Sequence, residues 1–256
     1  MAVIFIGDDV SRTKTPWMTY GVVVFCIWVF LQQVSERHGG LTMIERYAVV
    51  PADVATAFST DVLGVMDLRT TSTTPVQLSP SDFSAWKTLL TSVFLHGDLS
   101  HLFWNMFALV IFGRSVENRL GHVGFAYLFI ATGVLSSVAS VLVAVDSTTP
   151  SIGASGAIAG LKGAFLVLFF RSRILTVVPF GIAFPTFYVP APIVVGIWFY
   201  FQVKWGIADF NGTITSNIGW WAHIGGFVAG CGLVLVGSLA THRWRSIRTN
   251  QVAMPA

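Results

Sequence analysis

The sequence predicts an all-α integral membrane protein with six transmembrane helices, and two observations carry this prediction. Hydrophobic residues make up 54% of the chain and charged residues only 11%, whereas a soluble globular protein carries roughly 25% charged residues. The apolar residues are also gathered into runs, and about 20 mostly apolar residues are needed for a helix to cross a bilayer. We expect spans at residues 17–34, 98–113, 123–145, 155–170, 191–208 and 219–240.

The segments around these spans divide the chain into a membrane domain at residues 17–240 and two tails, 1–16 and 241–256. Residues 35–97 hold several charges and a Thr/Ser/Pro-rich stretch from Thr70 to Pro80, which make this segment too polar and irregular to span lipid. We expect it to form one long first loop with short interfacial helices. The first apolar run has no small-residue cleavage site after it, so it is interpreted as a retained helix.

The distribution of positive charge predicts the orientation in the membrane. Nine of the fifteen Lys and Arg residues fall in the tails and in the connections on their side, five fall in the opposite loops, and Lys162 lies within a span. Because cytoplasmic segments carry the excess of positive charge, both termini are expected to be cytoplasmic and the 35–97 loop non-cytoplasmic. The chain has neither a transit peptide nor a large cytosolic extension, which favours a bacterial plasma membrane.

Composition also argues against several other classes of function. The net charge is only +3, and no basic patch is interleaved with aromatic residues, so nucleic acid is not an expected partner. The two cysteines, Cys26 and Cys231, both lie in apolar runs, so we expect neither a disulfide framework nor a metal site.

A serine at the start of the fourth span is the first candidate for chemistry. Ser155 follows Gly153 and Ala154 and begins an apolar run of about 24 Å, shorter than the roughly 30 Å hydrocarbon core. Its start is therefore expected below the outer membrane surface. Free backbone N–H groups and the positive end of the helix dipole favour an oxyanion there. The alternative is that Ser155 is an ordinary N-cap residue.

His223 strengthens the case for chemistry, because an ionisable residue inside a span is costly and by default suggests function. It lies four residues into the sixth span, about 6 Å below the expected outer end, so its depth matches that of Ser155. The alternative is a histidine that hydrogen bonds a neighbouring helix. Small residues four positions apart let neighbouring helices approach closely. Both spans carry such a pair, Gly156 and Gly160 on the fourth and Gly226 and Gly230 on the sixth.

His101 and Asn105 form a third element, because residues at i and i+4 share one face of a helix. They lie on the second span, which also enters from outside, so both side chains could donate hydrogen bonds to a developing oxyanion. The alternative is a role in hydrogen bonding between helices. His96 is expected to be structural, and Asp98 or Ser100 to cap the helix.

No carboxylate is expected to complete a catalytic triad. Glu117 lies near the inner end of its span, one membrane width from His223, so we predict a dyad of Ser155 and His223. A zinc protease would need a His-Glu-x-x-His stretch, which the sequence lacks. An aspartyl protease would need two aspartates within the spans, and these are also absent from the sequence.

Taken together, these residues resemble the rhomboid family of intramembrane serine proteases. The resemblance covers about residues 86–232 and rests on four motifs in the family's order. They are His101-Leu102-Phe103-Trp104-Asn105, the spaced Gly113, Glu117 and Gly121, Gly153-Ala154-Ser155-Gly156, and Ala222-His223-Ile224-Gly225-Gly226.

The resemblance implies a six-helix rhomboid-like bundle and a role for each matching residue. Ser155 would be the nucleophile and His223 the general base and then the general acid, while His101, Asn105 and the Ser155 N–H would bind the oxyanion. It further implies that the substrates are transmembrane helices of other proteins, cut near their outer end, and that no cofactor is needed.

Three positions depart from the family pattern. Trp86-Lys87 stands where a Trp-Arg pair is common, and lysine cannot reproduce a bidentate guanidinium contact. Ala159 stands where an aromatic residue often packs on the histidine, and Lys162 stands where an apolar residue is expected. The competing functions are a non-catalytic rhomboid-like protein that binds membrane helices, and a transporter or channel, although the inverted repeats or paired broken helices of a transporter are not found.

Overall fold

The computed structural model describes residues 4–36, 42–61, 84–177 and 184–240. In chain order the elements are β1 (Ile4–Asp8), α1 (Trp17–Ser35), α2 (Met43–Tyr47), α3 (Pro51–Asp61), α4 (Ala85–Thr91), a 3-10 turn (Ser92–Phe94), α5 (Leu99–Val143), α6 (Ser155–Leu168), β2 (Arg173–Val177), β3 (Thr186–Pro190), α7 (Ala191–Phe210) and α8 (Trp220–Ala240). The expected 241–256 tail and the Thr70–Pro80 stretch lie outside the described residues.

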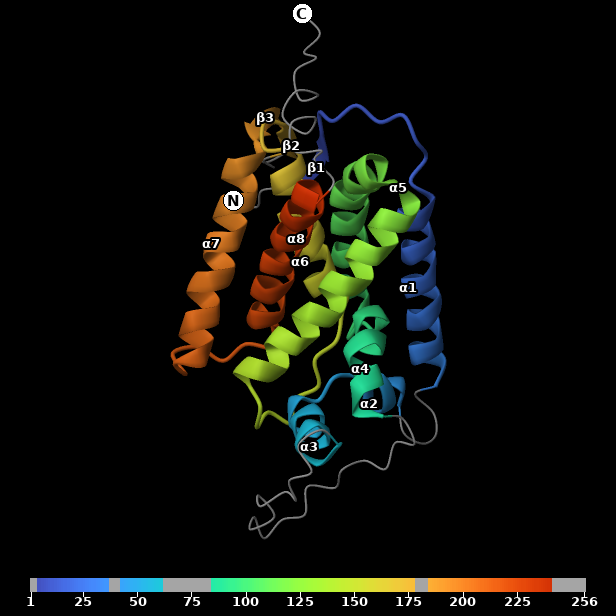
Figure 1. Ribbon diagram of the computed structural model, residues 1–256, viewed down its shortest axis with the longest axis vertical. Helices are drawn as coiled ribbons and strands as arrows, with labels where there is room; N and C mark the ends of the chain where they lie inside the picture. The colour runs from blue at the N-terminus through green and yellow to red at the C-terminus, as the bar shows by residue number, and fades with distance from the viewer. Residues whose placement is uncertain (1–3, 37–41, 62–83, 178–183, 241–256) are drawn as a thin grey trace, which may run out of the picture.

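The described chain is mostly helical, as predicted, but the helices do not divide at each expected span. Four of the described helices, α1, α5, α7 and α8, are long and apolar enough to cross a membrane, and α6 is shorter, with 14 residues. The expected spans 98–113 and 123–145 both fall in α5, which has 45 residues and would be about 67 Å long if straight. Gly121 interrupts this helix with φ 77° and ψ 170°, a conformation that glycine adopts at little cost. Figure 1 shows that the two arms of α5 turn back on each other.

The all-α prediction is wrong at one end of the molecule, where three strands form an antiparallel sheet in the order β1-β2-β3. The strand β1 comes from the segment that was expected to be an N-terminal tail. Asp8 at its end accepts a hydrogen bond from Ser115 Oγ at 2.8 Å and pairs with Arg12 at 2.8 Å, which fixes the sheet to α5. In Figure 1 the sheet lies at the end of the bend in α5, and α2, α3 and α4 lie at the other end.

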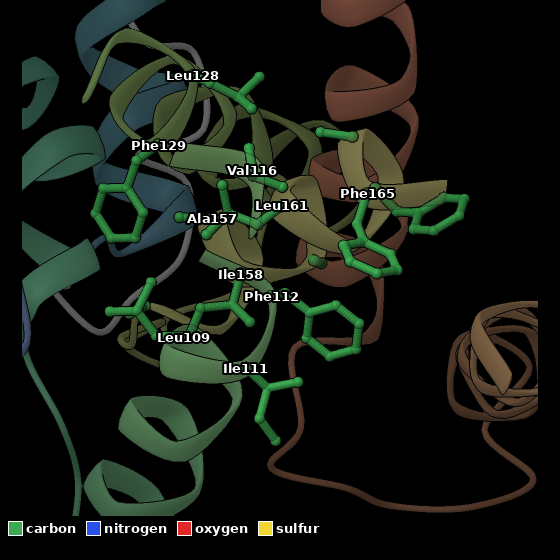
Figure 2. Packing of buried hydrophobic residues seen from close by; sticks show 14 of the residues in the cluster. Leu109, Ile111, Phe112, Val116, Leu128, Phe129, Ala157, Ile158, Leu161 and Phe165 are labelled. Carbon is green, nitrogen blue, oxygen red and sulfur yellow. The ribbon is translucent and has the colours of Figure 1, made fainter. Parts of the chain in front are cut away.

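The helix α6 forms the centre of the bundle. Ten of its 14 residues are buried, and it packs most extensively against α8 and α5. Figure 2 shows Leu109 and Phe112 from the first arm of α5, and Phe129 from the second, around Leu161 and Phe165 of α6. By contrast, the outer helices expose large apolar side chains, as expected where they face lipid: Trp17, Val24, Trp28 and Leu31 in α1, and Ile197, Tyr200 and Phe210 in α7.

Glycines bring α6 and α8 into backbone contact. A Cβ atom on Gly226 would collide with the carbonyl oxygen of Gly156, and one on Gly230 would collide with that of Gly160. The glycine pairs singled out from the sequence therefore meet each other directly. This contact places the first turns of α6 and α8 side by side, which is the condition for their polar side chains to meet.

Glu117 fixes α1 to the bundle at the end of the sheet. Its side chain is 1% exposed and accepts hydrogen bonds from the backbone N–H groups of Met18 and Thr19, at 2.9 and 2.7 Å, and from Thr19 Oγ1 at 2.6 Å. The first N–H groups of a helix have no partner within it, so the carboxylate satisfies two of them in α1. His122 also bonds to this carboxylate.

Candidate active site

The loop before α6 holds the serine in place. Ser151 and Val49 exchange two backbone hydrogen bonds, at 2.7 and 3.2 Å, so the first loop pairs with the approach to α6. Gly153 has φ 119°, a backbone conformation that favours glycine. Ala154 occupies the N-cap position and Ser155 is the first residue of the helix. Ser155 is therefore not the N-cap residue, and its hydroxyl is available for another partner.

That partner is His223. The distance between Ser155 Oγ and His223 Nε2 is 2.8 Å, a hydrogen bond between the first residue of α6 and the first turn of α8. The other ring nitrogen, Nδ1, lies 2.7 Å from the side-chain oxygen of Gln202 on α7. The structure thus brings together the two residues proposed for the dyad and adds Gln202, which the sequence motifs did not single out.

Two side chains of α5 converge beside the serine. A Cβ atom on Gly153 would lie 2.8 Å from His101 Nε2 and 3.6 Å from Asn105 Nδ2, so both nitrogens face the backbone two residues before Ser155. Asn105 is 7% exposed, and its Nδ2 has no hydrogen-bond partner within the described part of the chain. Asp98 caps α5 by accepting from the His101 N–H at 2.8 Å, as one of the two predicted caps.

The contact at His101 Nδ1 indicates which of the two ring nitrogens carries the proton. Gly97 N–H donates to His101 Nδ1 at 3.5 Å. A neutral imidazole carries its proton on one nitrogen only, so this contact leaves the proton on Nε2. His101 Nε2 and Asn105 Nδ2 are then two hydrogen-bond donors directed to the same place.

His96 lies behind this site and has a structural environment. Its ring is fully buried, its backbone N–H and carbonyl both bond to the side chain of Gln33, at 3.1 and 3.0 Å, and its ring packs edge-on against His101 at 5.2 Å between centroids. Burial, followed by the neighbouring His101, lowers the pKa of His96 to about 4. A neutral His96 can donate from Nδ1 to the Phe94 carbonyl at 3.3 Å.

Two of the three departures from the family pattern, Ala159 and Lys162, lie close to the site. Ala159 is fully buried and gives His223 no aromatic contact, while the indole ring of Trp198 lies 6.3 Å from the His223 ring. The ammonium of Lys162 lies 3.8 Å from the centre of that same indole ring, within the range of a cation–π interaction. The ammonium of Lys162 therefore lies over the face of the Trp198 ring, a contact that could not be inferred from its position in the sequence.

Carboxylates and metal ligands do not gather at the site. Within residues 4–36, 42–61, 84–177 and 184–240, no carboxylate hydrogen bonds to His223, and Glu117 bonds instead to the start of α1. The same residues contain no group of three His, Cys, Asp or Glu that could hold a metal ion. The arrangement is that of a hydrogen-bonded serine and histidine beside two side-chain donors.

A bundle of apolar helices with such a serine–histidine pair at the start of its central helix defines a membrane protein of the rhomboid class. The Rhomboid domain family model matches residues 83–239, more than half of the chain. The chain therefore belongs to the rhomboid family, which confirms the resemblance seen in the sequence, and it is an integral membrane protein.

Several curated relatives are similar to this chain. Rhomboid protease GluP of Bacillus subtilis (strain 168) is 34% identical over 145 residues, which are 57% of this chain and 25% of that protein. Rhomboid protein 1, mitochondrial, of Saccharomyces cerevisiae is 31% identical over 146 residues, 56% of this chain and 39% of that protein. RHOMBOID-like protein 4 of Arabidopsis thaliana is 27% identical over 268 residues, 97% of this chain and 60% of that protein. The chain thus corresponds to only part of the length of each relative.

Proposed function

We propose that this chain is an intramembrane serine endopeptidase that cleaves transmembrane helices of other membrane proteins with a dyad of Ser155 and His223. The observation that carries the proposal is the 2.8 Å hydrogen bond between Ser155 Oγ and His223 Nε2. Membership of the rhomboid family, with relatives named as proteases, supports the same reaction.

The first step is attack of Ser155 on a peptide carbonyl. His223 Nε2 accepts the hydroxyl proton while Oγ bonds to the carbonyl carbon, and the carbonyl electron pair moves onto oxygen. His223 then gives the proton to the departing amine as the C–N bond breaks. A water molecule activated by the same nitrogen releases the acyl group and restores the serine.

The negative charge that develops on the carbonyl oxygen needs donors. Asn105 Nδ2, His101 Nε2 and the backbone N–H of Ser155 are the proposed donors, and the last belongs to the first turn of α6, where N–H groups have no partner within the helix. Donors that are in place before the reaction lower the barrier because little reorganisation is then required.

The proposed arrangement in the membrane has six crossings. They are α1, the two arms of α5 on either side of Gly121, α6, α7 and α8. Both termini are then cytoplasmic, the 35–97 loop is non-cytoplasmic, and Ser155 and His223 lie toward the non-cytoplasmic leaflet. The positive charge of the tails supports this orientation. The bacterial plasma membrane remains our proposed location, and the relatives include mitochondrial and plant proteins as well.

A non-catalytic rhomboid-like protein is the main alternative. Such a protein has no need for a hydrogen-bonded serine and histidine, yet this chain keeps both, together with Asn105 and His101 beside them. The hydrogen bond between a candidate base and a candidate nucleophile therefore favours catalysis over simple binding of helices.

Cleavage of a model transmembrane substrate by the purified protein tests the proposal. We expect wild-type protein to cut the substrate and Ser155→Ala to leave it intact at an unchanged melting temperature. The substitution removes the attacking oxygen and leaves only a small void at the helix start. Cleavage by Ser155→Ala at near the wild-type rate would exclude Ser155 as the nucleophile.

A further inference from the structure

Gln202 touches the dyad from a third helix. Its side chain is 7% exposed and its Oε1 lies 2.7 Å from His223 Nδ1. Ser155, His223 and Gln202 come from α6, α8 and α7, so the chain of hydrogen bonds is complete only when these three helices are docked together.

The orientation of the Gln202 amide is fixed by its other end. The amide nitrogen, Nε2, lies 3.4 Å from the carbonyl oxygen of Trp198, one turn earlier in α7. A carbonyl oxygen can only accept a hydrogen bond. The NH₂ group therefore belongs on the Trp198 side, and the amide oxygen faces His223 as an acceptor.

This orientation selects one tautomer of His223. An acceptor at Nδ1 places the ring proton on that nitrogen and leaves Nε2 with the free electron pair that must receive the Ser155 proton. With the amide reversed, its NH₂ would donate to Nδ1, and the ring proton would lie on Nε2, directed at the hydroxyl. Such a histidine could not act as the base.

We propose that Gln202 is a positioning residue that holds His223 in the tautomer and orientation required of a general base, an inference that rests on the proposed protease function. It fills the role that a carboxylate has in other serine proteases. A neutral amide serves here because an ionised carboxylate at this depth would be costly to desolvate. It also supplies the ring orientation that Ala159, with its single methyl group, cannot provide.

The test compares acceptor and non-acceptor side chains at position 202. Gln202→Met keeps the length but replaces the amide by a weak acceptor, and Gln202→Glu keeps an oxygen acceptor. We expect Gln202→Met to lower kcat about 10–10²-fold, less than the full contribution of a general base, with KM nearly unchanged. Gln202→Glu should recover at least part of the lost kcat per folded molecule, although burying its carboxyl group should lower the melting temperature.

Labelling of Ser155 by a small fluorophosphonate measures activation of the nucleophile without a protein substrate. We expect the labelling rate of Gln202→Met to fall with kcat. Val195→Ala serves as the control, because it shortens a side chain of α7 that is 1% exposed and about two turns away. It should lower the melting temperature while the folded enzyme keeps its labelling rate. If Gln202→Met does not fold, Gln202→Leu, which has no acceptor and a similar size, provides the same comparison.

The possible outcomes separate the role of Gln202 from the proposed protease function. Wild-type labelling and kcat in folded Gln202→Met would overturn the role of Gln202 alone, as would a change confined to KM. A wild-type protein that is labelled and cleaves no faster than Ser155→Ala would overturn the proposed protease function, and the role of Gln202 with it.

Discussion

At the scale of a single residue, a buried side-chain donor without a hydrogen-bond partner lowers the stability of the folded protein. Asn105 Nδ2 is such a donor among the described residues, and leaving a buried polar group unsatisfied costs about 1–3 kcal/mol. The nitrogen faces the backbone of Gly153, two residues before Ser155. A carbonyl oxygen that becomes negatively charged during the reaction would be its missing acceptor.

We therefore expect Asn105→Ala to reduce turnover more than stability. Loss of one oxyanion donor in another serine protease costs about 10²–10³-fold in kcat, and the loss here should lie at or below the lower end because His101 Nε2 and the Ser155 N–H remain. KM and the melting temperature should change little. Kinetics and thermal unfolding of one detergent preparation measure both.

Leu109→Ala is the matched control on the same arm of α5. Leu109 is fully buried, and truncating such a side chain costs about 2–5 kcal/mol of stability, while the folded enzyme should keep its turnover. If Asn105→Ala behaves like this control, with a lower melting temperature and normal kcat per folded molecule, Asn105 only ties helices together.

Residues that belong to a local motif could be found from the sequence, and residues that act through a tertiary contact could not. Ser155, His223, His101 and Asn105 each lie in a short pattern with chemical meaning. Gln202 stands alone in an apolar helix, and only the docking of α7 beside α8 brings it to His223. The one available signal was an amide within a span, where polar side chains commonly bond to a neighbouring helix.

At the scale of elements, the closeness of α6 and α8 determines whether the dyad can form. Their backbones meet at Gly156 and Gly226, and again at Gly160 and Gly230. Close-packed interiors tolerate extra atoms poorly because neighbours must shift to admit them. An added methyl group at this interface should therefore separate the two helices that carry Ser155 and His223.

We expect Gly230→Ala to destabilise the protein by about 1–3 kcal/mol, the usual cost of overpacking, and to lower cleavage. Gly232→Ala is the matched control two residues further along α8, where a Cβ atom would meet nothing within 4 Å. Alanine is favoured over glycine in a helix by up to about 1 kcal/mol, so this control should be neutral or stabilising. Equal melting temperatures for the two variants would contradict the contact.

The sheet shows where the prediction of elements from the sequence failed. Each strand has five residues, and β1 pairs with β2, a segment distant in the sequence. No local pattern marks such pairing, because each strand is stabilised by its partner. The sequence did include Gly121 between the two arms of α5, but its positive φ became apparent only in the structure.

At the scale of the whole molecule, different structural elements lie at the two ends of the helix bundle. The sheet, the bend of α5 and the N-terminal segment share one end, whereas α2, α3, α4 and the approach to Ser155 share the other (Figure 1). Apolar side chains are exposed between these ends, as on the outer faces of α1 and α7. The sequence predicted this membrane-spanning character from composition alone, since an apolar lateral surface requires a composition poor in charge.

The orientation of the two ends across the membrane is a prediction that thiol labelling can test. Thr149 lies exposed in the loop before α6, at the end of the dyad, and Lys14 lies exposed between β1 and α1, at the end of the sheet. In bacterial cells that express the protein, a membrane-impermeant maleimide should label Thr149→Cys in intact cells. It should label Lys14→Cys only after permeabilisation, because the Lys14 end carries the excess of positive charge and should be cytoplasmic. The wild-type protein is the background control, since Cys26 is fully buried and Cys231 is partly buried within α8. Labelling of Lys14→Cys in intact cells, with protection of Thr149→Cys, would reverse the orientation and place the dyad near the cytoplasmic leaflet.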